Sequence, residues 1–227
     1  MTLEEIIYEV MEVGVKSAVT DQRARQYINR AQRWVCDKWN FTWMFNRVQV
    51  TIPSGYTSTK LDANFKQLNN EQSPVSFQYG PYPLPVVVTS RAKIESYGIF
   101  PWLETQFTYP LPGGYLPIRV VFLEQDGPGG QWTFNIPPQY SITGPAVFNV
   151  SAFWYPSPLE QGSDSNAMTL DGDLQDALIN RAKAIAYNAE EVDNPKGAAA
   201  QALAEASLTR AKYADSERRF GGRQCYM

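Results

Sequence analysis

The sequence predicts an α+β fold in which a helical bundle, made from both ends of the chain, is interrupted by an inserted β-rich domain. Apolar residues recur with the period of an α-helix near both ends, whereas the middle is rich in Pro, Gly, Tyr, Thr and Val and shows strand-like runs. Each terminal helix pair has too narrow an apolar surface to stand alone. We therefore expect residues 1–44 and 165–227 to form one discontinuous bundle around a domain of residues 45–164.

The N-terminal segment "TLEEIIYEVMEVG" predicts a short amphipathic helix. Thr2 stands three residues before Glu5, which is the spacing of a capping box. Its apolar residues follow the i, i+3, i+4 spacing of one helix face: Leu3, Ile6, Ile7, Val10 and Met11.

A second helix is predicted from about Asp21 to Lys38, after a capping residue in "TDQRARQYINRAQRWVCDKW". Its apolar stripe is Ala24, Tyr27, Ile28, Ala31, Trp34 and Val35. Arginines 23, 25, 30 and 33 are expected opposite that stripe.

The hydrophobic period changes to two in "FNRVQVTI", which predicts a strand from Phe45 to Ile52. Further strand-like runs follow, namely "VVVTS", "IRVVFLE", "QWTFNIP" and "AVFNVSAFWY". The segment "FLEQDGPGGQWTF" predicts a hairpin with its turn at 126–130. We expect a small β-sandwich or an open barrel.

The helical period returns after the polar connector 160–169. Asp171 or Asp173 is expected to cap a third helix that carries Leu174, Ala177, Leu178, Ile185 and Ala189 on one face. Asn194 and Pro195 are typical of the start of a fourth helix, which runs to the paired arginines near the C-terminus. Its mostly alanine face should let a neighbouring helix approach closely; that face is Ala199, Ala202, Leu203, Ala206 and Tyr213.

Residue usage argues against catalysis. The chain has no histidine, and its two cysteines, Cys36 and Cys225, are far apart in sequence. Catalytic triads with histidine, Cys/His zinc sites and a disulfide framework are therefore excluded. Adjacent acids on a helix point in different directions, and Asp171 and Asp173 are explained by helix capping. The segment "DGPGG" lacks the lysine and the Ser/Thr of a phosphate-binding loop. We expect neither an enzyme nor a bound cofactor or metal.

Charge and hydropathy exclude other classes. A net charge of -3 argues against a general nucleic-acid-binding protein. Basic residues gather between 21 and 60, whereas Arg119 is the only one between Gly98 and Asp176, so copies of the chain could attract each other. The acidic start and the lack of a long apolar run predict neither a secretory signal nor a membrane span.

The stretch "WVCDKWNFTWMF" is rich in aromatic residues. We expect Trp34, Trp39 and Trp43 to form an inter-domain core that joins the β insert to the bundle. Trp43→Ala should then lower the free energy of unfolding by about 3–5 kcal/mol, because it would leave a core cavity. A carbohydrate-binding sandwich on a helical stalk is the alternative function. Its stacking residues would be Tyr82, Trp102, Tyr109, Tyr115 or Trp132.

The last ten residues, "RRFGGRQCYM", are suited to docking on another molecule. Arg218, Arg219 and Arg223 could meet carboxylates, Phe220 and Tyr226 could enter apolar pockets, and Gly221 and Gly222 would let the tail adapt. The alternative is a frayed chain end.

Three stretches in this order resemble the head-to-tail adaptor (connector) proteins of tailed bacteriophages, of the tail tubular protein A type. They are "YINRAQRWVCDKWNFTWMFNRVQVTI", then "NIPPQY" with "VFNVSAFWYPSPL", and then "LDGDLQDALINRAKAIAYNAEE" before the long last helix. The residues that carry the resemblance are Asn29, Ala31, Gln32, Trp43, Tyr155, Leu159, Asp176, Ala177 and Ala182. The segment 72–114 departs from the family pattern.

This resemblance implies a dodecameric ring in the virion neck, made in the host cytoplasm, with the portal protein above and a tail nozzle or tail tube protein below. It implies that DNA passes through a central channel without specific recognition, and that Arg218 to Tyr226 reach into the portal. Arg23, Arg25, Arg30 and Arg33 would then lie at a subunit interface or line the channel; otherwise they form a solvated helix face.

Overall fold

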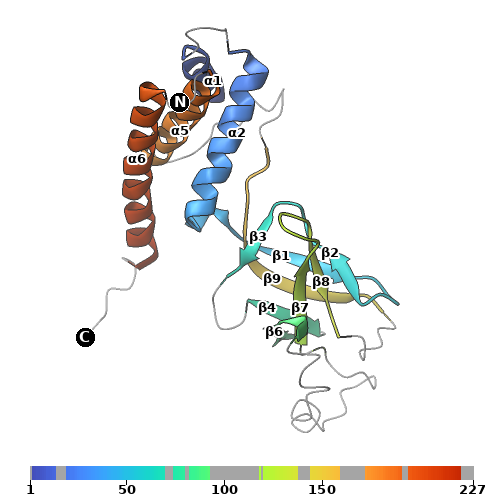
Figure 1. Ribbon diagram of the computed structural model, residues 1–227. Helices are drawn as coiled ribbons and strands as arrows, with labels where there is room; N and C mark the ends of the chain where they lie inside the picture. Colours follow the sequence, from blue (N-terminus) through green and yellow to red (C-terminus); the bar gives the residue numbers. More distant parts are fainter. Residues whose placement is uncertain are drawn as a thin grey trace, which may run out of the picture. The chain divides into compact units, whose positions relative to one another are not determined.

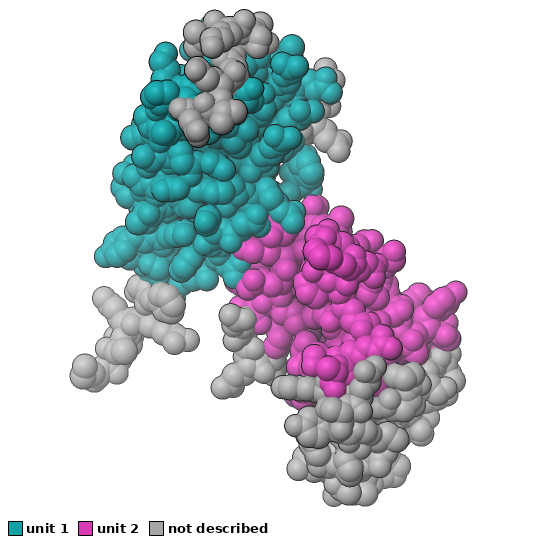
Figure 2. All heavy atoms as spheres, viewed as in Figure 1, with its two compact units in different colours: residues 1–43, 156–227 teal, residues 44–155 magenta. Residues whose placement is uncertain are grey.

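A computed structural model describes residues 2–13, 19–69, 74–79, 82–92, 118, 120–137, 144–158, 172–190 and 194–220. The chain divides into two compact units, coloured separately in Figure 2. A helical unit contains residues 1–43 and 156–227, and a β unit contains residues 44–155. The fold is α+β, with a β-rich segment between helices.

The helical unit contains four described helices, labelled in Figure 1: α1 (Leu3–Met11), α2 (Asp21–Lys38), α5 (Gly172–Glu190) and α6 (Pro195–Phe220). Helix α5 packs against both α2 and α6, and α1 packs against α2 and α5. The bundle core therefore joins residues from both ends of the chain. It includes Leu3, Ile6, Val10, Ala24, Ile28, Ala31, Leu178, Ile179 and Ala182.

Local capping accounts for the starts of α1, α2 and α6, as the sequence predicts. Of the two caps expected for the third helix, Asp171 lies outside the described residues and Asp173 lies in the first turn of α5. Thr2 and Glu5 form both hydrogen bonds of a capping box at α1. The Thr20 hydroxyl accepts the Arg23 backbone N–H at α2, and the Asn194 side chain accepts the Lys196 backbone N–H at α6.

The β unit begins with the last residue of a short 3-10 turn, Thr42–Met44. Its described strands are β1 (Phe45–Ile52), β2 (Ser58–Lys60), β3 (Phe65–Leu68), β4 (Val75–Tyr79), β5 (Tyr82–Pro85), β6 (Val87–Thr89), β7 (Val120–Gln125), β8 (Trp132–Asn135) and β9 (Ala146–Trp154). One sheet has the order β1-β9-β4-β5, with β3 also paired to β9; the other has the order β2-β8-β7-β6. The predicted hairpin is the β7–β8 pair, and its turn contains Gly127 and Gly129, both with positive φ.

The two sheets share one apolar core, which makes the unit a sandwich of two sheets. Ile52, Phe148 and Val150 contribute from the first sheet, and Val121 and Phe134 from the second. The rings of Phe134 and Phe148 lie 5.0 Å apart between centroids, so the two sheets touch directly.

The buried face of α6 differs from the sequence prediction. The predicted packing face is exposed, with Leu203 at 58% and Tyr213 at 67% of their full accessibility. The buried face consists of Ala200, Ala204, Ser207, Leu208, Ala211 and Asp215. Alanine occurs on both faces, so the hydrophobic period alone does not choose between them.

The prediction that Trp43 is a core side chain is wrong. Trp43 is 45% exposed, and its ring stacks on Phe41 with 5.9 Å between centroids. The buried aromatic residue of this stretch is Phe41. Since nearly half of its surface is open to solvent, removing the indole leaves no closed core cavity.

We accordingly expect Trp43→Ala to lower the free energy of unfolding by about 0.5–1.5 kcal/mol, the range of a lost aromatic pair. Urea denaturation monitored by circular dichroism measures this change. A loss above about 3 kcal/mol would show that Trp43 is enclosed after all.

Candidate interaction surfaces

Helix α2 presents a row of exposed arginines. Arg23, Arg30 and Arg33 lie on one face and are all exposed. Arg25 does not belong to this row: it is buried, and its Nε lies 2.9 Å from the Asp21 carboxylate. Its expected place at a subunit interface or in a channel is therefore wrong, because a step of two residues turns the side chain toward the bundle core.

The outer face of α6 exposes five residues with small or apolar side chains, interrupted by Arg210, which lies between Ala206 and Tyr213 on this face and pairs with Asp173. Three alanines, Ala199, Ala202 and Ala206, stand beside Leu203 and Tyr213, and all five are exposed. Small side chains allow the backbone of another helix to come close, while Leu203 and Tyr213 offer apolar area. The Tyr213 hydroxyl interacts with Glu217, and this hydrogen bond raises the pKa of the phenol. This set of five residues is called the α6 stripe below.

Helix α1 carries the opposite charge to α2 on its exposed side. Glu4, Glu5 and Glu12 are exposed around Tyr8, and α1 contains no lysine or arginine. The remaining acid, Glu9, forms an ion pair with Lys183 of α5, with 2.6 Å between oxygen and nitrogen. One helical unit therefore offers an acidic helix and an arginine row to its surroundings, which are complementary surfaces for unlike patches of two copies.

Asp215 is the centre of a buried polar cluster that holds the C-terminal part of α6. Asp215 is only 5% exposed to solvent. Oδ2 accepts the Trp39 indole N–H at 2.8 Å, and Oδ1 accepts the Thr42 backbone N–H at 2.9 Å and hydroxyl at 2.7 Å. Arg219 completes the cluster, with its Nε 3.1 Å from Oδ2. No periodicity in the sequence points to this carboxylate, because Trp39 and Thr42 lie more than 170 positions away.

The first residues of the predicted docking tail belong to helix α6. Arg218 and Arg219 belong to the last turn of α6, and the helix ends at Phe220. Arg218 is exposed, but Arg219 is half-buried in the Asp215 cluster, where its guanidinium also lies 5.8 Å from the Trp39 ring centre. Gly221, Gly222, Arg223 and Tyr226 lie outside the described residues.

Trp34 and Trp39 contact side chains of the helical unit. The Arg181 guanidinium of α5 lies 5.0 Å from the Trp34 ring centre and donates to Gln201 of α6. Burial lowers the pKa of Arg181, and Glu205 acts against that shift. Trp39 donates to Asp215 of α6. Both indoles therefore join α2 and its end to α5 and α6.

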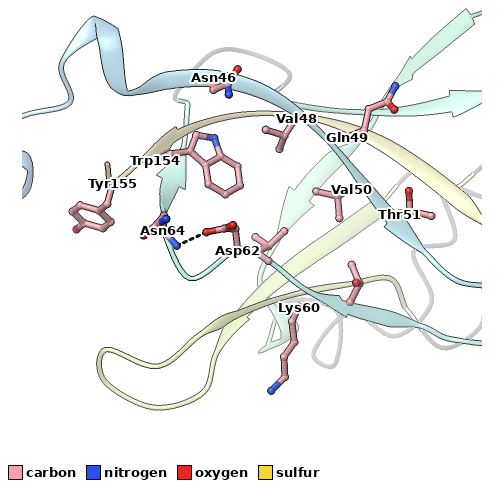
Figure 3. A pocket seen from close by; sticks show the side chains of 12 residues that line it. Asn46, Val48, Gln49, Val50, Thr51, Lys60, Asp62, Asn64, Trp154 and Tyr155 are labelled. Carbon is pink, nitrogen blue, oxygen red and sulfur yellow. Dashed lines mark hydrogen bonds between the residues drawn. The ribbon is translucent and has the colours of Figure 1, made fainter. Parts of the chain in front are cut away.

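The β unit contains an open hollow of about 490 Å³ beside β1. Figure 3 shows its lining side chains on β1, on the connection after β2, and at the end of β9. Val50 and Leu61 are buried in its wall, while Lys60 and Asp62 are exposed at its rim. Asp62 Oδ1 accepts the Asn64 backbone N–H at 2.7 Å, which fixes the connecting turn.

The described residues offer little to the carbohydrate hypothesis in the form predicted. Trp132 packs edge-on against Phe65 in the sandwich core, with 5.8 Å between ring centres. Trp102, Tyr109 and Tyr115, and the side chain of Tyr82, lie outside what the structure describes.

Among the described residues no group of three or more His, Cys, Asp or Glu side chains is placed to hold a metal ion. No described helix combines the length and the apolarity needed to cross a bilayer. Comparison of the chain with protein-family models and with curated protein sequences gives no match.

Proposed function

We propose that this chain is a structural adaptor of a tailed-bacteriophage virion, which forms a ring with its own copies, binds the portal protein and extends the DNA channel toward the tail. The proposal begins from the resemblance of the sequence to head-to-tail connector proteins. The observation that carries it is a helical unit, assembled from both chain ends, that exposes an apolar stripe on α6 and an arginine row on α2.

These surfaces suit a neighbour better than a substrate. Leu203 and Tyr213 are exposed beside three alanines, and a neighbouring protein that covered them would remove this apolar area from water. Helices α2 and α6 both pack on α5, so they can contact different neighbours. Contacts between unlike patches of identical chains close into rings when the rotation allows.

The portal and the tail protein are the partners of the proposed ring, and DNA crosses it without sequence-specific contacts. Weak phosphate contacts suit this role, since strong ones would hold the DNA in transit. Mixing the purified chain with portal rings and imaging by electron microscopy tests the proposal. An added symmetric layer on the portal is expected; portal rings that stay bare at micromolar protein would refute it.

Leu203→Asp is expected to prevent ring formation without unfolding the protein. The side chain is exposed, so the free energy of unfolding should change by about 1 kcal/mol or less. In the assembled ring, however, the same change places a charge in an apolar contact. Sedimentation velocity with portal rings measures the loss of the added layer.

Tyr56→Asp is the matched control for Leu203→Asp, because Tyr56 is an exposed apolar residue of the β unit. It should assemble like the parent chain. Equal assembly of the Leu203→Asp protein would remove the α6 stripe from the interface.

Deleting residues 220–227 should leave a folded protein that no longer joins the portal. Asp215 and Arg219 stay in place in this truncated chain, so α6 keeps its anchor. Circular dichroism checks the fold, and co-sedimentation with portal rings checks docking. Normal docking of the truncated chain would contradict a portal-binding role for the tail.

A further inference from the structure

Two exposed arginines of α2 have no ion-pair partner among the described residues. Both acids of this helix already pair with other arginines of α2, four positions away in each case. Arg23 and Arg30 therefore keep an unmatched positive charge on the surface. They are seven residues apart, so they lie on one face, about 10.5 Å apart along the axis at about 1.5 Å per residue. The remaining cation of α2, Lys38, lies in the last turn, where it complements the helix dipole.

Helix α1 and its C-cap carry acids with the same spacing. Glu5 and Glu12 are exposed and are also seven residues apart. Glu4 and Tyr8 complete this exposed surface, and Tyr8 is 64% exposed. Among the described residues only Glu9 of this helix has an ion-pair partner, on α5. The four exposed residues Glu4, Glu5, Tyr8 and Glu12 are called the α1 face below.

The two charged surfaces do not neutralise each other within one copy. No ion pair joins α1 to α2 among the described residues. Both helices turn their apolar residues into one core, which holds Ile6 and Val10 of α1 with Ala24 and Ile28 of α2. Their charged sides therefore point away from that core, and both are available to other molecules.

The spacing and the signs of these charges select the partner. A helix that pairs with Arg23 and Arg30 together must expose acids two turns apart, and the α1 face of an identical chain does so. Tyr8, between those acids, offers a ring on which a guanidinium can stack. One copy can give its α1 face to one neighbour and receive the α1 face of another on α2, which is a contact between unlike patches.

We propose that the α1 face of one copy binds the Arg23 and Arg30 side of α2 in the next copy. This inference rests on the proposed function, because it names the surfaces that meet in the proposed ring. The charges decide which surfaces meet and in which register, and Tyr8 adds apolar area. Exposed ion pairs are individually weak, so free copies should associate with a dissociation constant on the order of 100 μM at low salt.

The salt dependence of self-association distinguishes this contact from unspecific association. The chain has a net charge of -3, so an unspecific contact would strengthen when salt screens the repulsion between copies. The proposed contact should instead weaken about fivefold or more between about 20 mM and about 300 mM salt. Sedimentation equilibrium of the full chain at up to about 0.5 mM protein measures this change. Association that salt leaves unchanged or strengthens would overturn the inference.

Opposite charge reversals identify the two surfaces. Glu4→Arg with Glu12→Arg makes both surfaces basic, and Arg23→Glu with Arg30→Glu makes both acidic; Glu5 is kept because it belongs to the capping box. Each variant alone should associate about tenfold or more weakly than the parent chain. Their equimolar mixture should associate like the parent, since every copy then meets neighbours of opposite charge on both surfaces. A mixture as weak as the separate variants would overturn the inference.

Arg47→Glu with Lys60→Glu is the matched control. It changes the net charge as much as the acidic variant does, but on exposed residues of the β unit. Its association should stay within about twofold of the parent value. Circular dichroism checks that all three double variants are folded.

Portal rings separate this inference from the proposed function. A symmetric layer that forms on the portal with either charge-reversed variant alone would support the adaptor role and overturn the α1–α2 contact. Association that follows the charge reversals in solution, on portal rings that stay bare, would support the contact and overturn the adaptor role. No association at about 0.5 mM protein and low salt, with or without portal rings, would overturn the contact.

Discussion

Replacing Asp215 with alanine is expected to lower the free energy of unfolding of the helical unit by about 3–5 kcal/mol. The carboxylate receives the Trp39 indole N–H and two donors from Thr42, and it pairs with Arg219. Without it the half-buried Trp39 N–H and the two Thr42 donors lose this acceptor, and the guanidinium loses its counter-charge. The end of α6 would separate from the end of α2.

Thermal and urea denaturation followed by circular dichroism measure this effect. The control is Asp37→Ala, which removes an exposed carboxylate from an ion pair with Arg33 on α2 and should change the free energy of unfolding by about 0.5 kcal/mol or less. Asp215→Asn should fall between the two, since an amide keeps one acceptor oxygen but brings donors of its own. If Asp215→Ala cost no more than the control, the cluster would contribute no net stability.

Phe148→Ala should destabilise the β unit by about 3–5 kcal/mol. This residue lies in the middle strand β9, is fully buried, and contacts the rings of Phe77 and Phe134. Because Phe134 belongs to the opposite sheet, the substitution opens a cavity between the two layers. The strands around it cannot collapse into that space without breaking their register.

The two substitutions together test whether the units unfold separately. Asp215→Ala should move one transition and Phe148→Ala another, because each acts within its own unit. Tyr56→Ala is the control for the second, being exposed on the same unit, and should change stability by about 0.5 kcal/mol or less. A single transition that shifts equally in both variants would show that the units unfold as one.

Much of the secondary structure is predictable because its causes are local. A capping box at Thr2, a cap and proline at Asn194 and Pro195, and a change of hydrophobic period at Phe45 each act over a few residues. The glycines of the 126–130 turn likewise fix the β7–β8 hairpin by themselves. The starts of these elements and the position of this turn can therefore be predicted from the local sequence.

The candidate surfaces were harder to predict because a face is exposed or buried only relative to a partner. Arg25 is buried although Arg23, two residues earlier, is exposed. Trp43 is exposed, whereas Trp39, four residues earlier, donates a hydrogen bond to buried Asp215. The α6 stripe was identified as apolar, but it was expected to be covered.

The sequence by itself determined the helices, most strands of the sandwich and the return of the chain from a β-rich segment to a helical one. Only the tertiary structure decided which face of α6 is buried, how the nine described strands divide into two sheets, and that β1 lies at an edge among them. The physical reason is the distance along the sequence over which the interactions act. Capping, turns and periodicity are free-energy differences between neighbouring residues, whereas burial of Asp215 or the edge of β1 depends on segments that meet from opposite ends of the chain.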